Sequence, residues 1–147
     1  MNTPSKILLL PRILAGAPLL FFGVMHLSGA MPMRPLVEAA GLPMPAMASI
    51  VAPLAQIAAG LLLLAGALSR FSAVLAIGTM LGAIVTHMKI ANDQWPMPTA
   101  EDPGAVGAEP TFMIAIAAVI IACSVVVLIK GAGAMAFDSR TKPAANA

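Results

Sequence analysis

Charged residues are scarce in this 147-residue chain, in which eight Lys and Arg and six Asp and Glu make up only 10% of the residues while 60% are hydrophobic. Soluble domains carry roughly a quarter charged residues. This chain therefore has too few charges to cover a surface that faces water. The composition excludes a soluble cytosolic enzyme, a disordered regulator and a nucleic-acid-binding protein.

The chain has only one cysteine, Cys123, and no tyrosine. A single cysteine excludes an intrachain disulfide, a CxxC redox pair and a cysteine metal cage. The absence of tyrosine removes one common general acid. We therefore expect no catalytic residue in this chain, so that any redox chemistry comes from a bound cofactor or a partner.

What the chain does contain is four apolar runs without charge, each close to the length of about 20 residues that a helix needs to cross a bilayer. Lipid offers the backbone no hydrogen-bond partners, so each run should be a helix. We predict an all-α, integral membrane four-helix bundle that forms a single domain over residues 1–147. The spans are expected at residues 13–30, 46–68, 71–88 and 110–129.

Orientation follows from the basic residues, because Lys and Arg are enriched on the cytoplasmic side of membrane proteins. Only Ser69 and Arg70 separate the second and third spans, which predicts a tight helical hairpin. Six of the eight basic residues lie with this hairpin and the two termini, whereas four of the six acidic residues lie in the 89–109 loop. We predict an N-in/C-in topology, with both termini cytoplasmic and loop 89–109 outside.

Glycines within the spans indicate where helices approach each other, since helices in lipid associate through close packing of small residues. Two of them, four residues apart on the third span, form a GxxxG pattern. We assign helix packing to Gly16, Gly23, Gly60, Gly78 and Gly82.

Polar side chains inside the spans are few, and such residues should face the bundle interior or a water-filled cavity. His26, Gln56 and His87 fall in the predicted outer half, and Trp95 and Glu109 could join them from the outer loop. A neutral imidazole can donate at one nitrogen and accept at the other. We therefore predict an outward-facing pocket in which these five residues bind a cofactor, with quinone as the candidate.

Each of these residues also has a structural interpretation that the sequence leaves open. The two histidines could reach headgroup water, Gln56 could make an interhelical hydrogen bond, and Trp95 could be an interfacial anchor. Glu109 could belong to a solvated acidic rim. Two histidines without a third ligand predict no metal site.

The order of these features resembles the DoxX family of small four-span bacterial membrane proteins. The resemblance rests on RILAGAPLLFFGVMH at 12–26, QIAAGLLLLAGALSR at 56–70 and SAVLAIGTMLGAIVTH at 72–87. It continues in the tail GAGAMAFD at 131–138, which is similar to the family's closing Gly-Pro-Gly…Asp pattern. The family often has Glu at the position of Gln56, which weakens any proton-carrying role there.

The resemblance implies a membrane subunit of a quinone-linked or redox-associated oxidoreductase system, similar to thiosulfate:quinone oxidoreductase, in the bacterial inner membrane. It also implies that Asp138 is a capping or salt-bridging residue at the cytoplasmic face. Expected partners are the lipid bilayer and other membrane or redox subunits, with no nucleic acid, and a homo-oligomer stays open. The alternative is a non-catalytic scaffold or assembly subunit that docks a partner on its GxxxG face or its acidic loop.

Overall fold

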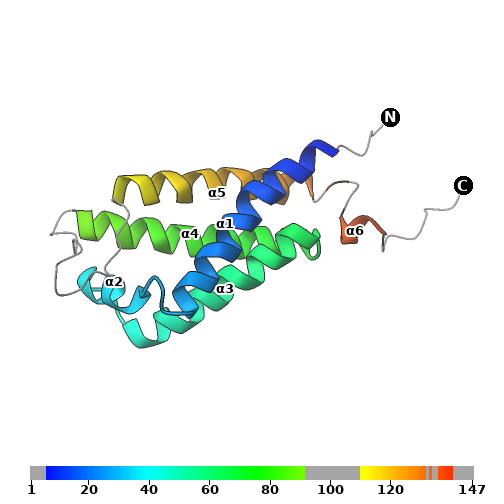
Figure 1. Ribbon diagram of the computed structural model, residues 1–147. Helices are drawn as coiled ribbons and strands as arrows, with labels where there is room; N and C mark the ends of the chain where they lie inside the picture. The colour runs from blue at the N-terminus through cyan, green and yellow to red at the C-terminus, as the bar shows by residue number, and fades with distance from the viewer. Residues whose placement is uncertain (1–5, 92–109, 132, 134–135, 141–147) are drawn as a thin grey trace, which may run out of the picture.

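Every regular element of the described chain is a helix, and these residues contain no strand. The computed structural model describes residues 6–91, 110–131, 133 and 136–140, and Figure 1 shows their arrangement. A short 3-10 helix, Lys6–Leu8, leads directly into the first α-helix. The α-helices are α1 (Leu9–Leu27), α2 (Met33–Ala39), α3 (Pro45–Ala65), α4 (Ser69–Ala91), α5 (Pro110–Lys130) and α6 (Phe137–Arg140).

Four of these helices, α1, α3, α4 and α5, are long and apolar enough to cross a membrane. The predicted four-helix membrane bundle is therefore confirmed, and the chain is a multi-pass membrane protein. The helix ends differ from the predicted span ends by a few residues. The second span ends at Ala65 instead of Leu68 because Gly66 adopts a left-handed conformation (φ 67°), which terminates α3.

The turn between α3 and α4 is as tight as predicted. The Ala67 N–H donates to the Leu62 carbonyl and the Gly66 N–H to the Leu63 carbonyl, which are the two hydrogen bonds of a Schellman motif. Glycine is suited to this position because a Cβ disfavours positive φ. The turn sends α4 back beside α3 and brings α3, α4 and α6 together at one end of the bundle (Figure 1).

Helices α1 and α3 are in close contact through three glycines. A Cβ placed on Gly60 would lie 2.7 Å from the Leu20 backbone nitrogen and 2.8 Å from the Gly16 carbonyl oxygen. A Cβ on Gly23 would lie 2.9 Å from the Pro53 carbonyl oxygen. The structure thus places Gly16, Gly23 and Gly60 where the two backbones approach each other, as small residues allow in lipid.

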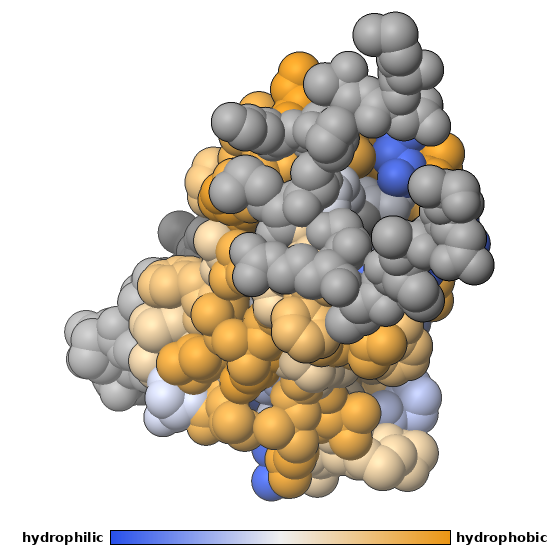
Figure 2. Space-filling view, turned by 90° about the vertical axis from the view of Figure 1, so that its right-hand side faces the viewer, coloured by the Kyte–Doolittle hydropathy of each residue, from blue (hydrophilic) through white to orange (hydrophobic). Residues whose placement is uncertain are grey.

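The bundle interior is lined by small and medium apolar side chains, such as Ala15, Leu63, Ala76 and Ile120. Large apolar side chains, in contrast, are exposed on all four long helices. Figure 2 shows that apolar residues make up most of the coloured surface on the side that carries α6. An apolar exterior on helices of this length fits contact with lipid tails.

Arg12 lies on α1 and is only 2% exposed, although it carries a charge. Its Nε donates to the Leu63 carbonyl at 2.9 Å and its Nη2 to the Leu64 carbonyl at 2.6 Å. These carbonyls belong to the last turn of α3, where helical partners run out. The guanidinium therefore caps α3 from the neighbouring helix.

Asp138 caps the opposite side of the same turn. Its carboxylate accepts hydrogen bonds from the backbone N–H groups of Leu68 and Ser69, each at 2.9 Å, and from the Ser69 hydroxyl. Its own N–H donates to the Gly66 carbonyl. These contacts give Asp138 the expected capping role and place a carboxylate at the positive end of α4.

Replacing Asp138 with alanine should lower the stability of the protein in detergent by about 1–2 kcal/mol, the usual cost of losing a helix cap. Burial disfavours the charged carboxyl, but the hydrogen bonds from Ser69 and Leu68 and the charge of Arg12 outweigh burial and lower its pKa. A depressed pKa contributes stability above the ordinary carboxyl value of about 4 and loses it as the pH falls through the lower, folded-state pKa. Thermal unfolding between neutral and acid pH should show this difference shrinking below about pH 4.

A matched control is Glu38→Ala, which removes the partner of Arg34 in an exposed ion pair. Such pairs contribute little stability, so this variant should unfold close to the wild type. A loss for Asp138→Ala no larger than that for Glu38→Ala would contradict the capping role.

Candidate functional site

A mostly apolar pocket of about 550 Å³ lies between the long helices and is covered on one side by α2. All four long helices line it, together with Met33, Leu36 and Val37 of α2. The short helix α2 packs on α3 and α4 at the end of the bundle opposite to α6 (Figure 1). The volume is within the range of roughly 300–1,000 Å³ that is common for small-molecule sites.

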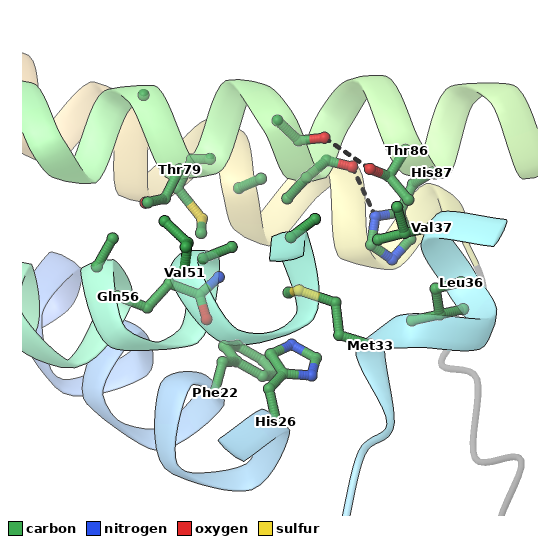
Figure 3. A pocket seen from close by; sticks show the side chains of 18 of the residues that line it. Phe22, His26, Met33, Leu36, Val37, Val51, Gln56, Thr79, Thr86 and His87 are labelled. Atoms are coloured by element: carbon green, nitrogen blue, oxygen red, sulfur yellow. Dashed lines mark hydrogen bonds between the residues drawn. The ribbon is translucent and has the colours of Figure 1, made fainter. Parts of the chain in front are cut away.

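Three of the predicted site residues, His26, Gln56 and His87, line this one pocket. They come from α1, α3 and α4 and are far apart in the sequence, so only the packing of the bundle brings them together (Figure 3). The predictions for Trp95 and Glu109 concern residues outside the described part of the chain.

His26 enters the pocket from the last turn of α1. Its Nδ1 lies 2.7 Å from the Met31 carbonyl oxygen, and its ring stacks on that of Phe22 with a centroid distance of 6.4 Å. A carbonyl oxygen only accepts hydrogen bonds, so Nδ1 carries the proton and donates. The bond fixes the ring and also holds the turn that leads into α2.

Gln56 is 2% exposed, and its Oε1 is buried without a hydrogen-bond partner among the described residues. Figure 3 shows its amide directed from α3 toward the rings of Phe22 and His26. The predicted alternative, an interhelical hydrogen bond, is not formed by this oxygen. Buried polar groups are nearly always paired, and an exception in a pocket is a place for a ligand atom or water.

Helix α4 contributes three polar side chains to the pocket. The Nδ1 of His87 lies 2.7 Å from the Ala83 carbonyl oxygen, and the Thr86 hydroxyl donates to the Gly82 carbonyl at 2.9 Å. Thr79, two turns further from α2, donates to the Ala76 carbonyl at 3.0 Å. These three side chains are therefore held by the backbone of their own helix.

Helix packing at Gly78 and Gly82 stays a prediction, because the described residues form no such contact there. A Cβ added to either residue would meet no described atom within 4 Å, so neither glycine is at a helix contact. Both line the pocket instead. They lack side chains where α4 faces a space, whereas Gly16, Gly23 and Gly60 lack them where α1 and α3 touch.

Thr79 and Thr86 are polar residues of the third span that the predicted set of site residues does not include. A signal was present, because residues 75, 79, 82 and 86 recur at helical spacing and are mostly small or hydroxylated. Three of these four side chains are small, so this face of α4 leaves space beside the helix. The apolar residues of α2 had no such signal, since they reach the pocket only through the fold.

A second, shallower groove runs along α1 and α5 on the apolar exterior. Its lining includes Leu14, Pro18, Ala115 and Val119, and it shares Phe22 and Ile116 with the pocket. Two residues therefore form the boundary between the pocket and a surface that faces lipid tails.

No group of three or more His, Cys, Asp or Glu side chains that could hold a metal ion occurs within the described residues. The polar atoms of the pocket are imidazole, amide and hydroxyl groups set in an apolar wall. This arrangement can orient a ring with polar substituents by hydrogen bonds and bury the rest of it in apolar contacts.

Comparisons with known proteins agree with this architecture. No curated protein and no solved structure gave a significant match. The family model DoxX, however, matches residues 7–89, a segment that runs from the start of α1 almost to the end of α4 and contains His26, Gln56 and His87. Because this match covers more than half of the chain, the protein belongs to the DoxX family.

Proposed function

We propose that this protein is a quinone-binding membrane subunit of an oxidoreductase system, and that the pocket holds the quinone head group. His26, Gln56 and His87 bind the polar ring substituents, and the α2 cap and the apolar walls exclude water. The observation that carries the proposal is the buried Gln56 Oε1, which has no partner among the described residues and can accept from the O–H of a quinol, inside an apolar pocket that also contains two imidazoles. The redox chemistry belongs to the quinone and to partner subunits.

A quinone fits this pocket better than a small polar molecule because it has an apolar tail. The lining is mainly Leu, Val, Met and Ala, with few polar atoms. Phe22 and Ile116 connect it with the groove between α1 and α5, along which a tail can extend into the bilayer. A ligand that is soluble in lipid can reach the site sideways between these helices.

The scaffold alternative receives no support from the structure at the surface it requires. Gly78 and Gly82 were its proposed docking face, and both line the pocket, where a ligand would compete with a partner. The acidic loop lies outside the described residues. A scaffold role would need another contact surface.

We also propose that the protein lies in the bacterial inner membrane with both termini in the cytoplasm. Arg12, Arg70 and Lys130 lie at the end of the bundle that carries α6, whereas Arg34 and Lys89 lie at the α2 end. Basic residues are enriched on the cytoplasmic side. The pocket would then lie toward the periplasm.

The test is quinone binding by the purified full chain in mild detergent. We expect quinone to co-purify, as detected by absorbance and mass spectrometry, and a short-chain benzoquinone to bind saturably after it is removed. His26→Ala and His87→Ala should each weaken binding of the reduced, quinol form of this compound roughly tenfold, since each removes a hydrogen-bonding group from the pocket. Lys89→Ala, an exposed change on the same helix as His87, should leave binding unchanged.

A specific combination of results would contradict quinone binding. If no quinone co-purifies, no short-chain quinone binds, and a partner protein is recovered in stoichiometric amount, the quinone-binding function is wrong. The scaffold function would then be the better explanation. Equal losses in the Lys89→Ala control would show that the histidine effects come from the fold and not from the pocket.

A further inference from the structure

The two threonine hydroxyl groups that line the pocket donate their protons to backbone carbonyls. Thr79 donates to the Ala76 carbonyl at 3.0 Å and Thr86 to the Gly82 carbonyl at 2.9 Å. A hydroxyl has one proton and two lone pairs. With these bonds in place, both threonine oxygens offer a ligand an acceptor.

The same holds for the two imidazoles in their neutral form. In His26 and His87 the Nδ1 proton is directed to a backbone carbonyl, of Met31 and Ala83 respectively, at 2.7 Å. A neutral imidazole has only one N–H, so the other nitrogen, Nε2, has a lone pair and no proton. Each ring is thus an acceptor at Nε2.

Gln56 adds a further acceptor, because its buried Oε1 has no partner among the described residues. Of these five polar side chains, two threonines, two histidines and one glutamine, only Gln56 has N–H donors beyond those that bind backbone carbonyls. The polar lining is therefore strongly biased toward acceptors, although the pocket is otherwise apolar.

On the basis of the proposed quinone site, we infer that the pocket selects the reduced, dihydroxy form of the ring over the oxidised form. A quinol presents two O–H donors, which match the acceptors of His26, the threonines and Gln56. A quinone presents two carbonyl oxygens, for which only the Gln56 amide has donors to offer. A carbonyl placed against an acceptor leaves both groups without a hydrogen bond, which is unfavourable inside an apolar pocket.

The expected size of this preference is about tenfold in the dissociation constant, equivalent to one buried hydrogen bond made or lost. Tighter binding of the reduced form makes a bound two-electron pair easier to reduce. A tenfold preference raises its midpoint potential by about 30 mV relative to the free pair. The site would then hold a quinol in preference to a quinone when both are present in the membrane.

The experiment compares three forms of one short-chain benzoquinone on the purified full chain. These are the oxidised form, the quinol kept reduced under anaerobic conditions, and the dimethyl ether of the quinol, which has no O–H. Binding of all three forms is measured by calorimetry in the same buffer. We expect the quinol to bind about tenfold more tightly than the other two forms.

The outcomes separate this inference from the function on which it depends. Equal affinity for all three forms overturns the preference and leaves the quinone site intact. Tighter binding of the oxidised form overturns it as well. No binding of any form overturns the proposed function itself.

Two near-isosteric variants test the origin of the preference. Changing both Thr79 and Thr86 to valine removes two acceptors at little change in shape, and it should reduce the ratio of the two dissociation constants about threefold with the affinity for the oxidised form unchanged. Thr111→Val, an exposed change on α5 outside the pocket, is the control and should leave the ratio unchanged. A double variant that weakens both forms equally would show a structural role for the threonines and contradict the assignment.

Discussion

Alanine at Gly60 should destabilise the bundle by about 2–3 kcal/mol, the cost of placing a side chain into a site that is already filled. The new Cβ would lie 2.7 Å from the Leu20 nitrogen and 2.8 Å from the Gly16 carbonyl oxygen. Both are backbone atoms of α1, so relief requires the whole helix to move away from α3. Unfolding in detergent by heat or denaturant measures the loss.

Gly78→Ala is the matched control, because Gly78 also lies inside a spanning helix but has no described atom within 4 Å of an added Cβ. Alanine is favoured over glycine in helices by up to about 1 kcal/mol. This variant should therefore unfold at the same temperature as the wild type or slightly above it. If Gly60→Ala behaved like Gly78→Ala, the close contact between α1 and α3 would be refuted.

Leucine at Gln56 should have opposite effects on ligand binding and on stability. Affinity for a short-chain quinone or quinol should fall roughly tenfold or more, because the amide that meets the ring is lost. The ligand-free protein should become more stable by about 1 kcal/mol, because a buried oxygen without a partner is replaced by apolar surface. Calorimetric titration and thermal unfolding of the same preparation measure the two changes.

Ser124→Ala separates these effects. Ser124 on α5 has the other buried side-chain oxygen without a partner among the described residues, and it does not line the pocket. Its replacement should raise stability and leave affinity unchanged. If Gln56→Leu instead lowered stability and left affinity unchanged, Gln56 would serve the fold and not a ligand.

The fold was largely predictable because it depends on features that are local in sequence. Apolar runs of about 20 residues must be helical in lipid whatever their neighbours are. The hairpin required only that Ser69 and Arg70 are too few residues for a longer connection. Helix ends were less accurate, since the end of α3 depends on the left-handed Gly66.

The candidate site was predictable in part, for a similar reason. His26, Gln56 and His87 were identifiable because polar groups in apolar helices are expensive and therefore few. Their hydrogen bonds were not identifiable, because the Met31 carbonyl reaches His26 only through the turn after α1. The carbonyl partners of Arg12 were not identifiable either, because they are about fifty residues away in sequence.

By itself, the sequence determined that this protein crosses a membrane with four helices and carries a few polar groups inside it, since both follow from the cost of moving each residue into lipid. Only the tertiary structure decided that those groups share one pocket, and that Gly60 lies at a helix contact whereas Gly78 lines the pocket. It also decided which protons are already bound to backbone carbonyls. Those features depend on distances between helices, which no local pattern of residues contains.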